Sequence, residues 1–176
     1  MNHQLTTTEL RRSKPVRTAF ATVARAPITV VLDGVHGNYN IGAIFRLCDA
    51  FLVERLVICS APVQLRKRKL IQAAMGAQHW VPWQEAPDAA DVVRGAQATG
   101  AWIAAVELTA ASVSPAELRP CFPAVLVLGG ERTGISQAVL DCAEQTVAIP
   151  MRGMANSLNV ATAAAIVLHE LVRGTP

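Results

Sequence analysis

An arginine six residues after an asparagine is the first feature of this sequence that suggests chemistry. Asn40 stands where a helix N-cap is expected, and Arg46 falls in the helix-like segment that follows. The guanidinium of Arg46 could clamp a phosphate with its fork of donors. Gly42, one helical turn earlier, predicts open space in front of that guanidinium. The alternative is a surface ion pair between Arg46 and Asp49, three residues further on.

A glycine-rich loop, Gly129–Gly134, follows the most apolar run of the chain. Glycine permits positive φ and close approach of the backbone to a ligand. The spacing matches neither a phosphate-binding P-loop nor the GxGxxG pattern of dinucleotide sites. Taken alone, Glu131 beside Arg132 is equally well explained by a solvated pair of loop side chains.

A third polar segment, Ile149–Asn159, lies between a strand-like run and an apolar helix. Asn156 and Ser157 are both good N-cap residues, so a structural role would account for one of them. Asn159 is different, because it falls within the first turn of the predicted helix. A buried amide needs hydrogen-bond partners, which a ligand or another residue of an active site could supply.

Strand-like and helix-like runs alternate along the chain and must position these three loops. We predict strands at residues 28–32, 56–59, 80–83, 102–106, 124–128 and 146–149. We predict helices at residues 40–52, 66–74, 88–98 and 157–172, with Ser136 capping a further short helix. This alternation predicts an α/β fold with a mostly parallel sheet flanked by helices. The three polar loops would then lie beyond the carboxyl ends of strands, where such sheets bind ligands.

The charge is distributed unevenly along the chain. Residues 1–70 carry a balance of +7, whereas residues 71–176 carry −4. The basic first part favours a polyanionic partner. The densest run, Arg66–Lys69, is also compatible with a solvated helix face. Residues 1–26 are predicted to form a basic arm or helix added to the main domain.

Cysteine spacing and hydropathy argue against several other classes. The four cysteines are scattered and form no CxxC pair, so neither a metal site nor a disulfide framework is predicted. The most apolar stretch, Leu158–Val172, contains too many polar residues for a membrane span. The first 26 residues lack the apolar core of a secretory signal. We therefore expect the protein in the reducing cytoplasm.

Together, the three polar segments resemble the signature motifs of the SpoU/TrmH methyltransferases of the SPOUT superfamily, in order and in spacing. Asn40 and Arg46 resemble the family's Asn-x-x-x-x-x-Arg motif. Residues 128–134 resemble its Leu-Gly-x-Glu-x-x-Gly loop, and residues 149–160 resemble Ile-Pro-Met-x-Gly-x-x-x-Ser-Leu-Asn-Val without gaps. One departure is Arg132, which stands where glycine is common in the family.

The resemblance implies a SPOUT-type domain over residues 27–176 whose C-terminal part is threaded into a deep trefoil knot. Periodicity could not predict this feature, because knots are almost absent from proteins. The resemblance also implies a homodimer through the knotted region, with the active site near the subunit interface.

The implied function is S-adenosyl-L-methionine-dependent methylation of a ribose 2′-hydroxyl in tRNA or rRNA. The implied catalytic residues are Arg46, Glu131, Ser157 and Asn159. The implied cofactor contacts are Leu108, Gly129, Ile149, Met151 and Leu158. The predicted contacts to RNA are Asn40, Arg46, Arg11, Arg12, Arg66 and Lys67.

Arg46 could act in one of two ways, as the base that activates the hydroxyl or as a clamp for the target phosphate. A guanidinium is effectively never deprotonated, so the simpler role is to grip a phosphate and stabilise a developing alkoxide. Glu131 would orient Arg46 or receive the proton. The leading alternative function is a non-catalytic RNA-binding protein with the same fold. A methyltransferase for a small molecule or a protein is a second alternative, which the basic arm disfavours.

Overall fold

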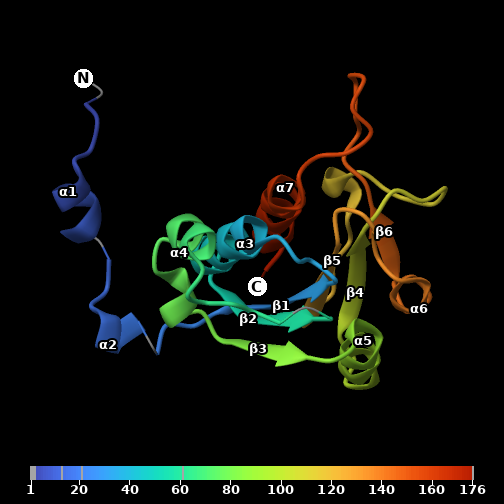
Figure 1. Ribbon diagram of the computed structural model, residues 1–176, viewed down its shortest axis with the longest axis horizontal. Helices are drawn as coiled ribbons and strands as arrows, with labels where there is room; N and C mark the ends of the chain where they lie inside the picture. Colours follow the sequence, from blue (N-terminus) through green and yellow to red (C-terminus); the bar gives the residue numbers. More distant parts are fainter. Residues whose placement is uncertain (1–2, 13, 21, 61, 176) are drawn as a thin grey trace.

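A parallel β-sheet runs through the middle of the molecule (Figure 1). The computed structural model describes residues 3–12, 14–20, 22–60 and 62–175. Within these ranges six strands pair in the order β3-β2-β1-β5-β4-β6, and every pair is parallel. The strands are β1 (Ala26–Asp33), β2 (Val53–Cys59), β3 (Trp83–Ala86), β4 (Trp102–Val106), β5 (Ala124–Gly129) and β6 (Gln145–Val147). The predicted α/β fold with a parallel sheet is confirmed.

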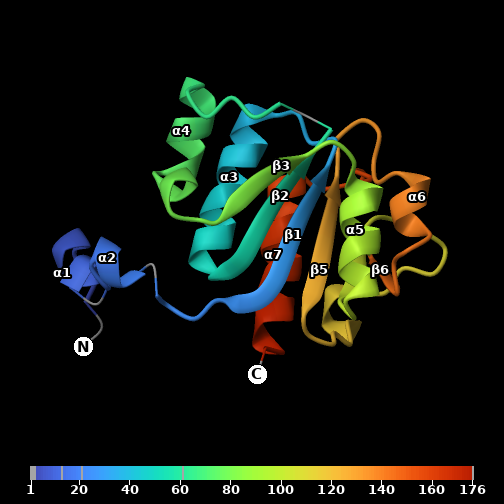
Figure 2. The ribbon, with the colours of Figure 1, turned by 90° about the horizontal axis from the view of Figure 1, so that it is seen from below.

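Helices cover both faces of this sheet (Figures 1 and 2). One face carries α3 (Asn38–Ala50), α4 (Arg68–Ala74) and α7 (Val160–Arg173). The other carries α5 (Ala89–Ala98) and α6 (Gln137–Leu140). Two 3-10 turns, η1 (Ala77–His79) and η2 (Pro115–Glu117), connect elements. No described helix has both the length and the apolar character that crossing a bilayer requires.

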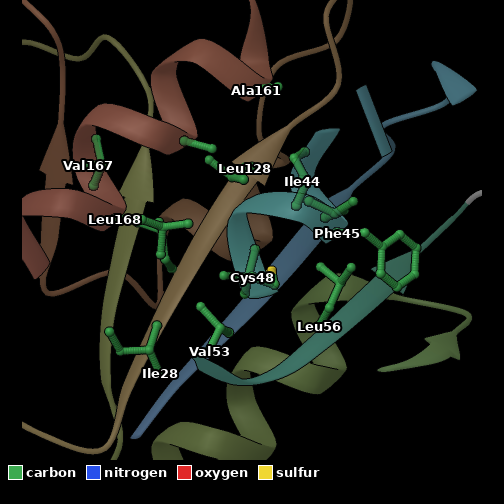
Figure 3. Close-up of a cluster of buried hydrophobic side chains, with 14 of the residues drawn as sticks. Ile28, Ile44, Phe45, Cys48, Val53, Leu56, Leu128, Ala161, Val167 and Leu168 are labelled. Atoms are coloured by element: carbon green, nitrogen blue, oxygen red, sulfur yellow. The ribbon is translucent and has the colours of Figure 1, made fainter. Parts of the chain in front are cut away.

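The central strand β1 is buried on both sides. Ile28, Val30 and Leu32 pack into the core beneath α3 and α7, whereas Val31 packs into the core beneath α5. Figure 3 shows Ile28 in the first of these cores, together with Phe45 of α3. Successive residues of a strand point to opposite faces. A strand covered on both faces is therefore apolar at most positions, which explains the apolar run Val30–Leu32 of β1.

Several predicted boundaries were wrong. The last helix begins at Val160 rather than at Ser157, because Asn159 is its N-cap. The helix predicted at residues 40–52 is α3, which begins at Asn38. Asn40 therefore lies inside the first turn of α3 instead of capping it. Trp80 follows a 3-10 turn and the next strand starts only at Trp83, so the extended piece predicted at 80–83 is misplaced.

The N-terminal segment contains two short helices, α1 (Thr7–Arg12) and α2 (Arg17–Phe20), which lie to one side of the sheet (Figures 1 and 2). Arg25 joins this segment to the sheet. Its guanidinium donates to the carbonyl oxygens of Val53 at 3.0 Å and Trp80 at 3.1 Å. It also lies 5.5 Å from the centre of the Phe20 ring, within the range of a cation–π contact.

The open space that Gly42 predicted beside Arg46 does not exist, because α4 fills it. A Cβ atom on Gly42 would lie 2.5 Å from the carbonyl oxygen of Leu70 and 2.9 Å from the Cβ of Ala73. Both are closer than ordinary van der Waals contact. Glycine therefore allows α3 and α4 to pack backbone against backbone.

We expect Gly42→Ala to lower the free energy of unfolding by about 1–3 kcal/mol, because the new methyl group meets backbone atoms that cannot move cheaply. Gly95→Ala is the matched control, since Gly95 lies in α5 with no atom within 4 Å of the added Cβ. It should raise stability by about 0.5–1 kcal/mol through helix propensity. Urea unfolding followed by circular dichroism measures both. Equal stability of the two variants would contradict the packing described here.

Candidate functional site

A cavity of about 1120 Å³ opens at the carboxyl edge of the sheet. Its walls are the segments that follow β4, β5 and β6, together with the start of α7. The carboxyl ends of parallel strands meet at one edge of a sheet, so these segments converge although they are distant in sequence. Among the described residues, no group of histidine, cysteine and acidic side chains is arranged to hold a metal ion.

The structure brings most of the predicted site residues to this cavity. It is lined by all five predicted cofactor contacts and three of the four predicted catalytic residues: Leu108, Gly129, Ile149, Met151, Leu158, Glu131, Ser157 and Asn159. Leu108 is 74% exposed and Leu158 is 36% exposed. These two leucines give the cavity apolar surface that is open to a ligand.

The glycine loop after β5 folds tightly against the loop after β1. A Cβ on Gly129 would overlap the backbone of Gly134, and one on Gly130 would overlap the carbonyl of Gly34. The N–H of Gly130 donates to the carbonyl of Asp33 at 2.9 Å, and the Asp33 carboxylate accepts from the N–H of Ser136 at 2.9 Å. A side chain at Gly130 would push the two loops apart, and one at Gly129 would disrupt the glycine loop itself.

A chain of side-chain hydrogen bonds joins the three polar segments. The Asn40 amide nitrogen donates to the Glu131 carboxylate, and the Asn40 oxygen accepts from the Asn159 amide at 2.9 Å. The Asn159 oxygen in turn accepts from the N–H groups of Ala161 at 3.0 Å and Thr162 at 3.4 Å, which caps α7. Because a carboxylate only accepts and a backbone N–H only donates, every amide in the chain has a single satisfying orientation.

Asn40 is the central residue of this hydrogen-bond chain. It is buried, with only 9% of its surface exposed. Both ends of its side chain are used inside the protein, so it holds Glu131 and Asn159 in fixed positions. Its assignment as a contact to RNA stays a prediction. Gly37 leaves room for this arrangement, since a Cβ there would lie 3.1 Å from a carboxylate oxygen of Glu131.

Arg46 lies apart from the other predicted catalytic residues. Its side chain is exposed on α3 and is not among the residues that line the cavity. Within the described part of the chain, it forms no ion pair with Asp49. The Asp49 carboxylate instead accepts a hydrogen bond from the indole N–H of Trp80 at 2.7 Å. The ion-pair reading of Arg46 is therefore wrong.

The remaining predicted RNA contacts are surface residues outside the cavity. Arg11 and Arg12 lie exposed in the last turn of α1, and Arg66 and Lys67 are exposed just before α4. The four residues lie on segments at the side of the molecule opposite β6 (Figure 1).

Sequence reasoning missed Glu107. This residue lines the cavity, and its carboxylate accepts from the N–H groups of Leu108 and Ile135, both at 3.0 Å. It thereby joins the loop after β4 to the loop after β5. The signal was available, because Glu107 follows an apolar strand at the same edge of the sheet as the three loops that were recognised.

The buried thiols are not candidates for nucleophilic chemistry. Burial raises the pKa of the Cys59 thiol to about 11, and the nearby charges of Asp33 and Asp88 add to this shift. Burial also raises the pKa of Cys48 well above its ordinary value. Both thiols therefore stay protonated at neutral pH, and neither is among the lining residues.

Residues 27–169 match the SpoU rRNA Methylase family. Since the match spans most of the chain, the protein belongs to this family.

Named relatives and solved structures agree with this placement. The chain is 34% identical over 146 residues to the tRNA (guanosine(18)-2′-O)-methyltransferase of Escherichia coli (strain K12), which covers 83% of this chain and 63% of the relative. The crystal structure of the A. aeolicus TrmH/SpoU tRNA modifying enzyme is 30% identical, with a TM-score of 0.77 over 88% of this chain and 78% of that one. An AdoMet-bound rRNA methyltransferase from Sinorhizobium meliloti is 28% identical, with a TM-score of 0.77 over 88% of this chain and 59% of that one. The chain thus spans less than two thirds of the E. coli relative.

Asn159 allows its two roles, capping α7 and bonding Asn40, to be separated. Asn159→Ala removes both and should cost about 1 kcal/mol or more of the free energy of unfolding. Asn159→Asp keeps the oxygen that caps the helix and adds a favourable charge at its N-terminus, so most of the stability should remain. Chemical denaturation compares the two. Equal losses in both variants would contradict the capping role.

Proposed function

We propose that this protein is an S-adenosyl-L-methionine-dependent methyltransferase that modifies a ribose 2′-hydroxyl in tRNA or rRNA. The observation that carries the proposal is the cavity at the carboxyl edge of the sheet, with Glu131 and Asn159 joined at its wall through Asn40. The names of the relatives, which include tRNA and rRNA methyltransferases, support the same reaction and substrate class.

The residues around the cavity fit the cofactor. A volume of about 1120 Å³ is ample for a nucleoside with an amino-acid tail. Leu108, Met151 and Leu158 offer apolar contact for the adenine ring, while Gly129 and Ile149 would present backbone groups to it. The AdoMet-bound structure from Sinorhizobium meliloti supports the choice of cofactor.

The side chains have complementary tasks in the proposed reaction. When bound, S-adenosyl-L-methionine supplies an electrophilic methyl carbon, so that the ribose oxygen gains a C–O bond as the C–S bond breaks. Glu131, held by Asn40, receives the hydroxyl proton directly or through water. Arg46 grips the neighbouring phosphate and stabilises the alkoxide as it develops. Ser157 and Asn159 position the ribose and the loop before α7.

We further propose that the active unit is a homodimer, formed through a C-terminal region threaded as a trefoil knot. Arg46 is exposed on α3 and is not part of the cavity wall of its own chain. A second chain docked against α3 and α7 would supply its Arg46 to this cavity.

The RNA would extend beyond the cavity to basic residues on the surface. Residues 1–26 would act as a basic arm of the domain at 27–176, with Arg11 and Arg12 contacting phosphates. Arg66 and Lys67, before α4, would extend the same surface. The reaction would take place in the cytoplasm, where the four free cysteines stay reduced.

The proposal is tested with radiolabelled S-adenosyl-L-methionine and total RNA separated into tRNA and rRNA, followed by digestion and identification of the labelled nucleoside. We expect a 2′-O-methylated nucleoside in one fraction. Arg46→Ala should lower turnover by about 100-fold or more while changing cofactor affinity by less than about three-fold, because Arg46 acts on the transition state and lies outside the cavity. A wild-type protein that neither labels RNA nor binds the cofactor would instead be a non-catalytic RNA-binding protein.

The proposed dimer predicts complementation between inactive chains. Chains carrying Arg46→Ala are mixed with chains carrying Glu131→Ala under conditions that exchange subunits. If Arg46 acts on the partner's cavity, each mixed dimer holds one complete site, and about a quarter of wild-type turnover should return at random mixing. If Arg46 serves its own chain, the mixture stays inactive, as each variant does alone.

A further inference from the structure

The C-terminal end of α3 carries a hydrogen bond that the proposed reaction does not use. The indole N–H of Trp80, which follows the η1 turn, donates to the Asp49 carboxylate at 2.7 Å. Both groups are partly buried, so the bond is shielded from competing water. A carboxylate in the last turn of a helix is unfavourably placed in the field of the helix dipole, and a donor held against it offsets that cost.

Asp49 is also an acidic residue at a helix spacing that allows it to pair with Arg46. The two residues are three apart on α3, a spacing at which opposite charges on a helix surface form an ion pair. No such pair forms among the described residues, and Arg46 stays exposed. The indole holds this carboxylate through Oδ1, in a position where the carboxylate forms no ion pair with the guanidinium.

Trp80 is itself firmly placed. Gly76, with φ of +95°, lies against its ring, and a Cβ there would lie 2.9 Å from the ring carbon Cη2. The carbonyl of Trp80 accepts from the guanidinium of Arg25 at 3.1 Å, and the same guanidinium bonds the carbonyl of Val53 at 3.0 Å. The indole is thus fixed from the ring side and from the backbone side, and its N–H faces Asp49.

We propose that Trp80 is a positioning residue for Arg46: by holding the Asp49 carboxylate, it keeps the Arg46 guanidinium free for an RNA phosphate. This inference rests on the proposed function, because it assigns Arg46 to RNA. It adds a residue 34 positions away in the sequence to the machinery of the site. It also explains why an acidic residue is tolerated so close to an arginine that must bind an anion.

The test compares wild type with Trp80→Phe, Asp49→Asn and the double variant Trp80→Phe/Asp49→Asn. Phenylalanine keeps an aromatic ring against Gly76 but lacks the N–H, so Asp49 becomes free to pair with Arg46. We expect Trp80→Phe to weaken binding of the tRNA and rRNA fractions and to lower kcat/KM by about two- to five-fold, the scale of an exposed ion pair. Asp49→Asn should stay near wild type, because an amide oxygen still accepts from the indole and carries no charge.

The double variant decides between positioning and mere packing. If Trp80 acts through Asp49 on Arg46, removal of the Asp49 charge restores RNA affinity to within about 1.5-fold of wild type. If Trp80 only stabilises the fold, the double variant is at least as impaired as Trp80→Phe, and the proposal is overturned. Thermal unfolding of each variant ensures that assays run on folded protein.

A further pair of variants separates this proposal from the proposed function. In an Arg46→Ala background, Trp80→Phe should change RNA affinity no further, since the arginine it protects is gone. A further loss there would overturn the positioning role. Failure of the wild type to methylate any RNA would instead remove the proposed reaction, and the RNA-affinity series would still report on Trp80.

Discussion

The hydrogen bonds of Asn40 are the constraint on which the site depends. This one buried side chain joins Glu131, from the loop after β5, to Asn159, which caps α7. The direction of every bond is set by its ends, a backbone N–H at one and a carboxylate at the other. As a result, a single relative arrangement is set for three elements: the start of α7, the loop after β5 and the first turn of α3. An unmade bond at Asn40 would leave a buried amide without a partner, whereas Glu131 and Asn159 are exposed to solvent.

Close backbone approach is what allows these loops to reach Asn40. Gly130 lies against the carbonyl of Gly34, so the loops after β1 and β5 meet without side chains between them. Gly42 likewise allows close backbone approach, in this case between α3 and α4. Glu107 then ties the loop after β4 to that after β5 through two backbone N–H groups. Close backbone approach at the glycines and the hydrogen bonds of Asn40 and Glu107 together hold the loops that line the cavity.

The parallel sheet and its carboxyl edge could be predicted, because a strand buried on both faces leaves a continuous apolar run such as Val125–Leu128. The pairing of β1 with β5 could not, since nothing local reports a contact between residues so distant in sequence. Asn159 was recognised as anomalous but not as the cap, because Asn156 and Ser157 were equally good caps by type. Gly42 was misread for a related reason: its neighbour is α4, and the sequence does not state which element faces a glycine.

Arg46 differs in kind from the rest of the site. Glu131 and Asn159 are held by bonds to Asn40, whereas Arg46 is an exposed side chain whose charge is satisfied by none of the ion pairs in the described residues. A site that grips an anion from solution needs such a residue, because a guanidinium already paired would have to break that pair first. Glu131 and Asn159 therefore line the cavity in positions set by hydrogen bonds, whereas Arg46 stands exposed outside it. The cost of leaving a cation unpaired is small at an exposed position, where water solvates it.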